Sequence, residues 1–542
     1  MMKRKTMYLR FLMFFLTFSA GIALIGCSED DTDFTDDVTE DDDDVDPGTE
    51  DDFPGPTYSD DYTGIASWQD RAKWNLANVH DPTVEKDGEY FYMYNTDASY
   101  GNAHEGNGHY PVRRSTDLVE WEFMGMVFPE APAWIKDSLN NMRAQMDPPL
   151  EPIEDPNYGF WAPHIQKTGD TYRMYYSVVV TNPIVGTDPN TSWTERAFIG
   201  LAESTDLSSN TWEDKGMVVS SVADGVESYE RDGGDDWSGY FKFNAIDPSF
   251  IETPNGEHWL IYGSWHSGIA AVQLNAETGK PNELNDLEDY GSRIAGRGNV
   301  NSNRWQALEA PEIIYNEDTG FYYLFLAYDE LSVAYNTRVA RSENIEGPYI
   351  GIDGANVTEG AEAWPIITHP YAFDGHPGWV GISHPSVFQD PESDQWFYSS
   401  QGRLPENVPG INASNAVMMG QVRKIEWTSD GWPVVAPERY ADVPDTEITA
   451  EDIQGTWEVI TLEYEYRNIQ ESSDVIFHED NTLTGAIDGS WSFDESTGIL
   501  TVNDIELIVD DAWDWEASPR STTITFSGIN ESGRSVWGKK DN

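Results

Sequence analysis

Three acidic side chains stand beside prolines at widely separated points of the sequence. Asp81 and Asp247 each directly precede a proline, and Glu309 stands two residues before another. If folding gathers them, like charges raise one another's pKa values, a cost that function explains more often than packing does. Such a set can hydrolyse a glycosidic bond, because one acid protonates the leaving oxygen and a second carboxylate activates water or attacks the sugar. The third acidic side chain can adjust the pKa of the general acid or orient it.

Five segments that share one layout would bring these acids together. Each runs from a proline through apolar residues and a turn into an aromatic-rich strand. Turn residues at matching offsets, such as Asp87-Gly88 and Asn255-Gly256, predict hairpins. The five segments are HDPTVEKDGEYFYMY from His80, WAPHIQKTGDTYRMYY from Trp161, IDPSFIETPNGEHWLIY from Ile246, EAPEIIYNEDTGFYYLFL from Glu309 and SHPSVFQDPESDQWFYS from Ser383.

Repeated antiparallel sheets that close in a ring form a β-propeller, and five repeats predict five blades. The first strand of each blade lines the central channel, so the residues at its start converge on one pocket. A solenoid is the alternative, but its repeats are shorter and more uniform. We therefore expect an all-β fold with a five-bladed β-propeller as the catalytic domain over residues 61–446.

Two further residues of the aligned segments belong to the predicted pocket. Trp161 and His384 stand where other blades present their acids. Trp161 either offers a face on which a sugar stacks or packs in the channel wall. His384 is either a metal ligand or a hydrogen-bonding partner of a neighbouring acid.

Residues 447–542 follow a different pattern. Gly455-Thr456-Trp457 opens a series of alternating strands with turns such as Asp488-Gly489, and the series ends at Val536-Trp537. This pattern predicts a small antiparallel β-barrel or sandwich as a C-terminal domain. Its sequence offers no evident catalytic set.

The N-terminus has the pattern of a targeting segment. A basic stretch over 3–10 and an apolar run over 11–26 predict a signal peptide over 1–27, because the run is too short for a membrane span. The run ends at Cys27, which resembles the lipidated cysteine of bacterial lipoproteins. The acidic segment 28–60 predicts a disordered tether. The acidic residues directly after Cys27 resemble the surface-export signal of Bacteroidetes lipoproteins, and the alternative is that they are only solvated linker. We therefore expect an outer-membrane lipoprotein exposed at the cell surface.

Composition restricts the partners of the protein. A formal net charge of -64 repels phosphate backbones, which argues against nucleic acid and favours a neutral polysaccharide over an anionic one. The 21 Trp and 27 Tyr residues suit a β-protein whose rings stack on sugars. A single cysteine excludes an internal disulfide and a thiolate metal site. We expect a monomer.

The propeller segments resemble glycoside hydrolase family 43, and within it the endo-acting arabinanases. The resemblance covers roughly Ser67 to Pro437, and 447–542 resembles the C-terminal β-barrel of two-domain endo-arabinanases. Its sharpest stretches are NVHDPTV around Asp81, FWAPHI around Trp161, NAIDPSF and YGSWHSGI between Asn244 and Ile269, and ALEAPEI around Glu309.

The resemblance implies a reaction and a role for each acid. It implies endo-hydrolysis of the α-1,5-linked L-arabinofuranosyl backbone of arabinan, with inversion of configuration. By the same resemblance Asp81 is the general base, Glu309 is the general acid, and Asp247 tunes and orients Glu309.

The resemblance also implies a metal and a set of substrate contacts. Arabinanases of this family keep a calcium ion at the channel centre, held by one histidine and waters, and His384 matches that histidine. The SHPSV run around it departs from the family's more usual Gly-His-Asn. Asn244, Trp265 and His266 match substrate-contacting segments.

Two alternatives remain open. An exo-acting α-L-arabinofuranosidase or a β-xylosidase of the same family would use the same acids, and the loops around the channel would decide between a groove and a closed pocket. A non-catalytic glycan-binding lipoprotein could keep the propeller, but it should have lost an acid, and none is missing.

Overall fold

The structure is a computed structural model that describes most of the chain after Asp52. The described residues are 53–58, 75–96, 108–145, 149–180, 196–222, 241–298, 307–406, 408, 415 and 418–541. They belong to one compact unit, Phe53–Asn542. The predicted signal peptide with Cys27 lies outside the described residues, as does the predicted tether apart from 53–58. Within the described ranges, no helix has the length and hydropathy that a membrane crossing needs.

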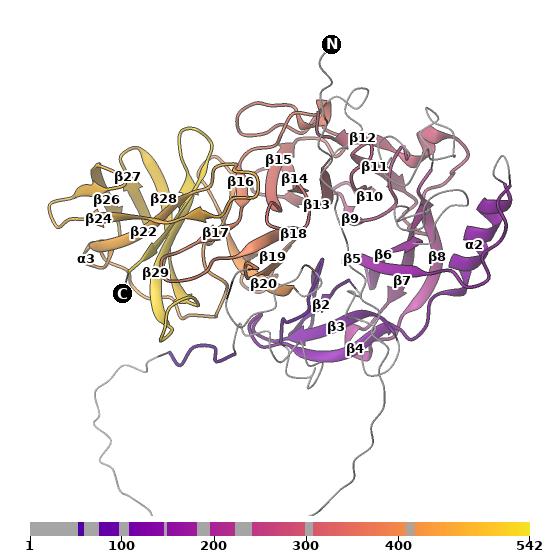
Figure 1. Cartoon of the computed structure of the whole chain (residues 1–542), viewed down its shortest axis with the longest axis horizontal. Helices are drawn as coiled ribbons and strands as arrows, with labels where there is room; N and C mark the ends of the chain where they lie inside the picture. Colours follow the sequence, from indigo (N-terminus) through magenta and orange to yellow (C-terminus); the bar gives the residue numbers. More distant parts are fainter. Residues whose placement is uncertain are drawn as a thin grey trace, which may run out of the picture. The chain divides into compact units, whose positions relative to one another are not determined.

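Five four-stranded antiparallel sheets confirm the predicted propeller (Figure 1). The strands of each blade pair in chain order, so each hairpin adds the next strand to the same sheet. The first blade contains β1 (Thr83–Asp87), β2 (Tyr90–Tyr94), β3 (His109–Ser115) and β4 (Glu122–Phe128), and the second contains β5 (Tyr158–Thr168), β6 (Thr171–Val180), β7 (Arg196–Ser204) and β8 (Glu213–Ser220). The third blade contains β9 (Ser249–Glu252), β10 (His258–Tyr262), β11 (Ile269–Leu274) and β12 (Ser292–Ala295), and the fourth contains β13 (Leu308–Asn316), β14 (Phe321–Tyr328), β15 (Asn336–Ser342) and β16 (Ile366–Thr368). The fifth blade contains β18 (Val380–Gln389), β19 (Trp396–Arg403), β20 (Met419–Trp427) and β21 (Pro433–Val435).

The first strands of the blades form the inner ring. Strand β1 contacts β5, β5 contacts β9, β9 contacts β13, β13 contacts β18, and β18 returns to β1. The segment before β1 also closes the ring, because Gly420 N–H donates to Leu76 O (2.7 Å) and Val79 N–H donates to Met418 O (3.2 Å). The starts of all five inner strands therefore surround one channel.

The aromatic-rich second strands fill the spaces between blades. Successive side chains of a strand point to opposite faces, so one strand serves two neighbouring blades. In β6 the ring of Tyr175 stacks on Phe250 of the third blade, with ring centroids 5.2 Å apart. The adjacent Tyr176 instead packs on Phe128 of the first blade, at 5.0 Å. Burial of such rings on both faces holds each blade against its neighbours.

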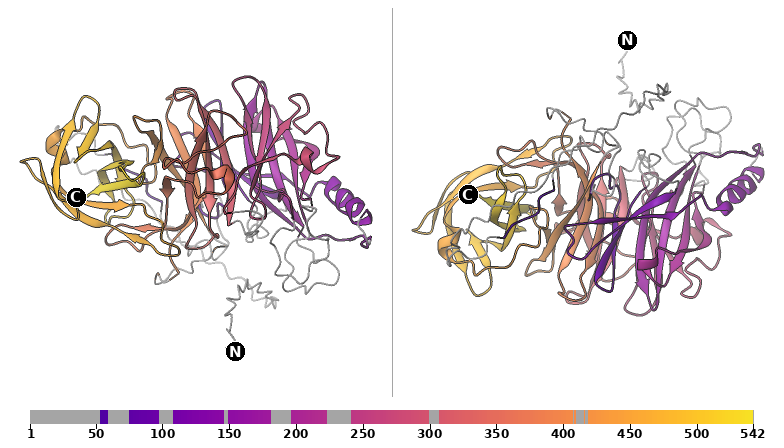
Figure 2. Two further views of the ribbon diagram at one scale, coloured as in Figure 1. Left: turned by 90° about the horizontal axis from the view of Figure 1, so that it is seen from above. Right: turned by 90° about the horizontal axis from the view of Figure 1, so that it is seen from below.

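Helical structure in the described residues is short and peripheral. Helix α2 (Ala133–Ala144) packs against the outer strand β8, at the edge of its blade in both views of Figure 2. The remaining helices are the 3₁₀ turns η3 (Leu207–Ser209), η4 (Leu287–Tyr290) and η5 (Val357–Glu359) and the single turn α3 (Ala450–Ile453).

The C-terminal strands close into an eight-stranded antiparallel barrel, which confirms the barrel form of the prediction (yellow in Figure 1). Closure comes from pairing of the first strand with the last. The barrel interior contains Trp457, Phe477, Trp491 and Phe526. The strands are β22 (Gly455–Thr461), β24 (Ser473–Phe477), β25 (Thr482–Gly485), β26 (Gly489–Asp494), β27 (Ile499–Val502), β28 (Ile505–Asp514), β29 (Ser521–Ile529) and β30 (Ser535–Lys540).

Backbone pairing and buried charge join the barrel to the propeller. Strand β17 (Tyr371–Ala372), which follows the fourth blade, pairs in parallel with β23 (Gln470–Glu471) of the barrel segment. Lys539 of β30 is buried among three carboxylates, those of Glu438 (3.0 Å), Asp514 (3.0 Å) and Glu516 (3.2 Å). Near the chain's described start, Phe53 and Tyr58 pack on Trp513 and Trp515 of the barrel.

Candidate active site

Each blade has a left-handed residue directly before the aligned proline, in or just before its inner strand. Such backbones are uncommon outside glycine and persist only where the surrounding structure imposes them. In three blades the pairing register also shifts at this point. A bulge of this kind re-aims the side chains around it. The φ angles are 47° at Asp81, 35° at Ala162, 53° at Asp247, 50° at Ala310 and 61° at His384.

Asp81 is held as an ionised carboxylate. His384 Nδ1 lies 2.9 Å from its Oδ1, and the Thr96 hydroxyl donates to its Oδ2. Burial raises the pKa of Asp81, but the charge and hydrogen bond of His384, with the charge of His80 and the hydrogen bond from Thr96, together lower that pKa to about 2. A carboxylate that keeps its negative charge in a buried site can act as a base.

Glu309 has the opposite environment. Its Oε2 accepts hydrogen bonds from Ser264 Oγ (2.9 Å) and Trp265 Nε1 (2.8 Å), and its Oε1 accepts one from Tyr335 OH (2.7 Å). These three donors are neutral. Burial raises the pKa of Glu309, and the hydrogen bond from Tyr335 and the charge of His384 offset only part of that rise. A carboxyl group with a raised pKa can act as an acid.

Asp247 resembles Glu309 in that its pKa is raised. Its backbone N–H donates to Ser177 Oγ (3.1 Å), and its Oδ2 accepts the backbone N–H of Ala310 (3.1 Å). Burial raises the pKa of Asp247, His384 lowers it, and the charges of Glu309 and Asp81 raise it further. Asp247 and Glu309 therefore titrate as a pair that retains a proton more readily than isolated carboxyl groups do.

His384 bears the positive charge of the site. Burial lowers its pKa, but the charges of Asp81, Asp247 and Glu309 and the hydrogen bond to Asp81 raise that pKa to about 9. Because Nδ1 contacts Asp81, Nε2 is the ring nitrogen left for a cation. Metal-binding histidines commonly have a carboxylate on their other nitrogen, and His384 has this arrangement.

The donor set around His384 limits the kind of metal site that fits. In the part of the chain that the structure describes, no three His, Cys, Asp or Glu side chains are grouped so as to hold a metal ion. These residues therefore do not form a site of several carboxylate oxygens, which is the kind of site that calcium usually occupies. They fit an ion that is held by the His384 imidazole and water.

A second polar layer lies one step deeper in the channel, at residues that follow the prolines. His164 Nδ1 is 3.2 Å from Glu312 Oε2, which also accepts from Ser249 Oγ (2.9 Å). The Val387 backbone N–H donates to Glu312 Oε1 (3.1 Å). These contacts join four blades beneath the acids, and His164 and Glu312 line one small cavity together with Asp247 and His384.

The predicted substrate contacts differ in exposure. Trp161 is half-buried and packs on Val179, Ala197 and Ile246. Asn244 is 5% exposed and accepts a hydrogen bond from Ser221, and His266 is 1% exposed. Trp265 is half-buried, with its ring nitrogen on Glu309. Contact of these four residues with a substrate stays a prediction.

Three residues of the site were missed by the sequence reasoning. Thr96 and Tyr335 follow second strands of blades, where the loop sequences do not repeat. Ser264 directly precedes Trp265 within YGSWHSGI, so the resemblance marked its segment but not its contact with the acid.

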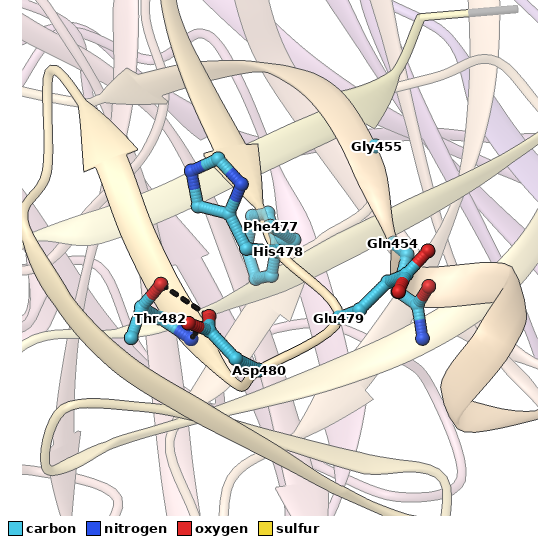
Figure 3. A pocket seen from close by; sticks show the side chains of 7 residues that line it. All are labelled: Gln454, Gly455, Phe477, His478, Glu479, Asp480 and Thr482. Carbon is cyan, nitrogen blue, oxygen red and sulfur yellow. Dashed lines mark hydrogen bonds between the residues drawn. The ribbon is translucent and has the colours of Figure 1, made fainter.

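A separate depression on the barrel offers no comparable set of acidic side chains (Figure 3). It is lined by Gln454, Gly455, Phe477, His478, Glu479, Asp480 and Thr482. There Thr482 donates to Asp480 within one turn (2.6 Å).

Comparison with known proteins agrees with this geometry. The sequence profile described as "Glycosyl hydrolases family 43" matches residues 76–433, which include all three acids. The chain belongs to glycosyl hydrolase family 43. This confirms the predicted family. The profile of a C-terminal lipocalin-like domain matches residues 437–538 of the same family 43 chain.

The similarity to individual family 43 proteins extends through both folded parts. An extracellular endo-α-(1→5)-L-arabinanase of Thermotoga petrophila is 27% identical over 508 residues, covering 88% of this chain and 96% of the relative. Extracellular endo-α-(1→5)-L-arabinanase 2 of Bacillus subtilis is 25% identical, covering 85% and 93%. The crystal structure of endo-1,5-α-L-arabinanase from Thermotoga petrophila has a TM-score of 0.64 at 25% identity, covering 86% of this chain and 99% of that one.

Proposed function

We propose that this family 43 protein is an endo-acting glycosidase that cleaves the α-1,5-linked L-arabinofuranosyl backbone of arabinan. Relatives with that printed activity match along nearly their whole length. The observation that carries the mechanism is the contrast between two buried carboxyl groups, because the pKa of Asp81 is lowered and the pKa of Glu309 is raised.

The proposed reaction is a single displacement with inversion. Asp81 takes a proton from a water molecule, and that water attacks the anomeric carbon of an arabinofuranosyl unit. Glu309 donates its proton to the glycosidic oxygen as the bond to the leaving chain breaks. Asp247 keeps the pKa of Glu309 high through the repulsion between the two carboxylates.

The surrounding side chains prepare both groups for these steps. His384 and Thr96 orient Asp81 and keep it ionised. Ser264, Trp265 and Tyr335 direct hydrogen bonds at Glu309, which fixes the carboxyl group near the leaving oxygen. A calcium ion on His384 Nε2 would supply a positive charge that lowers carboxylate pKa values and orders water.

Product analysis tests the endo action. Linear debranched arabinan, an aryl arabinofuranoside and xylan are incubated with the protein, with Glu309→Gln as the inactive control. We expect a ladder of short arabino-oligosaccharides from arabinan. Release of arabinose alone would instead identify an exo-acting arabinofuranosidase, and preferential attack on xylan would identify a xylosidase.

The anomer of the first product tests the mechanism. An inverting enzyme releases the β-anomer from an α-linked substrate, and proton NMR detects it before mutarotation. An initial α-anomer would mean retention, which requires a carboxylate nucleophile that the proposal does not contain.

We also propose that the protein is anchored to the outer surface of a bacterial cell through a lipid on Cys27. The basic and apolar pattern of residues 1–27 supports this, and the relatives are described as extracellular. Radiolabelled palmitate should be incorporated into the native protein and not into Cys27→Ala. Protease accessibility on intact cells tests surface exposure, and size-exclusion chromatography of the soluble portion tests the expected monomer.

A further inference from the structure

The loop between β14 and β15, residues 329–335, connects the proposed general acid to the barrel. Leu308 and Glu309 pair with Tyr328 and Ala327 at the end of β14, so this loop begins beside the acid. At its far end Tyr335 is buried and donates its hydroxyl proton to Glu309 Oε1 (2.7 Å). The position of Tyr335 therefore depends on the conformation of this loop.

A segment of the barrel, residues 462–469, holds the start of the same loop. Arg467 Nε and Nη2 lie 2.7 Å and 2.5 Å from Glu330 Oε1. Tyr466 OH lies 3.0 Å from Oε1 and 3.1 Å from Oε2 of the same carboxylate. Two adjacent barrel residues thus direct three donor groups at one carboxylate of the loop.

Neighbouring contacts complete the attachment. Asp329 accepts a hydrogen bond from Asn336 Nδ2 (3.1 Å) and forms an ion pair with Arg297. The barrel also reaches this ion pair, because Arg297 Nη2 donates to Tyr464 OH (3.3 Å). Leu331, next in the loop, packs with Ala310 and Tyr335.

We propose that Arg467 and Tyr466 are positioning residues of the active site, which act through Glu330 to hold Tyr335 against Glu309. The inference rests on the proposed role of Glu309 as general acid. It assigns a function to the barrel, which then completes the active site of the propeller in addition to packing beside it.

Exposure of the two barrel residues argues against a role confined to stability. Tyr466 is 51% exposed, and the Arg467 side chain is 36% exposed. Both side chains keep a large exposed part, and ion pairs that solvent reaches contribute little to folding free energy. The catalytic rate is more sensitive than the folding free energy to the position of this loop, because a small displacement of a catalytic group lowers the rate strongly.

Arg467→Ala and Tyr466→Phe in the full chain test the proposal, with Lys424→Ala as the matched control. Lys424 forms another propeller–barrel ion pair, 2.8 Å from Asp510. We expect Arg467→Ala to lower kcat on linear arabinan by about tenfold, as a misplaced catalytic group does. Tyr466→Phe should have a smaller effect in the same direction. The control should lose melting temperature without this loss of kcat per folded molecule.

A double-mutant cycle with Tyr335→Phe separates positioning from general damage. If Arg467 acts through Tyr335, then Arg467→Ala changes kcat little once the hydroxyl is absent. The basic limb of the pH profile should move to higher pH in Arg467→Ala, Tyr466→Phe and Tyr335→Phe, because the hydrogen bond from Tyr335 lowers the pKa of Glu309. The ionisable groups that face Glu309 and set this limb are Asp81, Asp247, Tyr335 and His384.

Hydrogen–deuterium exchange of residues 329–335 gives a readout that needs no substrate. We expect faster exchange in Arg467→Ala than in the native protein and in the Lys424→Ala control. Unchanged exchange, or fully additive effects of Arg467→Ala and Tyr335→Phe on kcat, would overturn the inference. If the native protein does not cleave arabinan, the proposed function fails, whereas the exchange result still decides whether the barrel holds this loop.

Discussion

Replacing His384 by Asn tests whether the charge beside Asp81 keeps the proposed base ionised. Asn retains an N–H donor near the position of Nδ1, and it tolerates the left-handed backbone of this residue, whose φ is 61°. The change therefore removes mainly the positive charge. Burial raises the pKa of Asp81, and His384, the largest of the opposing causes, acts with the charge of His80 and the hydrogen bond from Thr96 to bring that pKa from 3.8 to about 2. That difference corresponds to about 2.5 kcal/mol.

The sign of the expected effect follows from the role of Asp81. A general base must be ionised, so its pKa sets the acidic limb of kcat/KM. Without the charge of His384, burial meets less opposition and the pKa of Asp81 rises. We expect the acidic limb to move up by about two pH units. The variant removes the charge in either form, as an imidazolium or as a cation bound to the ring.

The assay is kcat/KM on linear arabinan at a series of acidic pH values, with thermal melting at each pH. His164→Asn is the matched control, because it makes the same substitution at a channel histidine that contacts Glu312 (3.2 Å) instead of Asp81. An acidic limb that stays at its native pH in His384→Asn refutes the reasoning. So does an equal shift in the control.

Three further predictions concern the acids, the ion and the barrel. Asp81→Asn and Glu309→Gln should each lower kcat by at least about 100-fold with unchanged melting, since each removes one half of the acid/base pair, and a loss below about tenfold would remove that residue from its role. Chelation should lower the rate and the melting temperature together, and added calcium should restore both; full activity of protein shown by elemental analysis to be metal-free would exclude the ion. Lys539→Met should destabilise the protein by about 3–5 kcal/mol, because three buried carboxylates lose their cation. An unchanged melting temperature in Lys539→Met would contradict that interpretation.

The propeller could be predicted because its unit repeats. Each repeat must fill the space on both sides of its sheet, and the aromatic run of the second strand does this, as Tyr175 and Tyr176 do for two neighbouring blades. Alignment on the prolines also placed Asp81, Asp247 and His384 in one ring. Their shared left-handed backbone shows the physical basis of that alignment.

Residues outside the repeat could not be predicted from it. Thr96 and Tyr335 lie in loops that differ from blade to blade, so no fixed offset marks them as partners of the acids. Exposure is also set by tertiary packing. Asn244 and His266 match substrate-contacting segments, yet they are 5% and 1% exposed in the folded chain. The attachment of the barrel to residues 329–335 involves side chains of two domains, which no pattern within either domain reveals.

Asp81 and Asp247 occupy the same position in two blades, yet the pKa of one is lowered and that of the other is raised. Backbone conformation does not distinguish them, because their φ angles are 47° and 53°, and burial raises the pKa of both. The difference lies in the charged groups that other blades present, because the charges of Glu309 and Asp81 raise the pKa of Asp247 further. His384 places a positive charge 2.9 Å from Asp81, whereas Ala310 offers Asp247 a neutral backbone N–H at 3.1 Å. Equivalent acids of one ring thus acquire opposite pKa shifts from the charged and neutral groups around them.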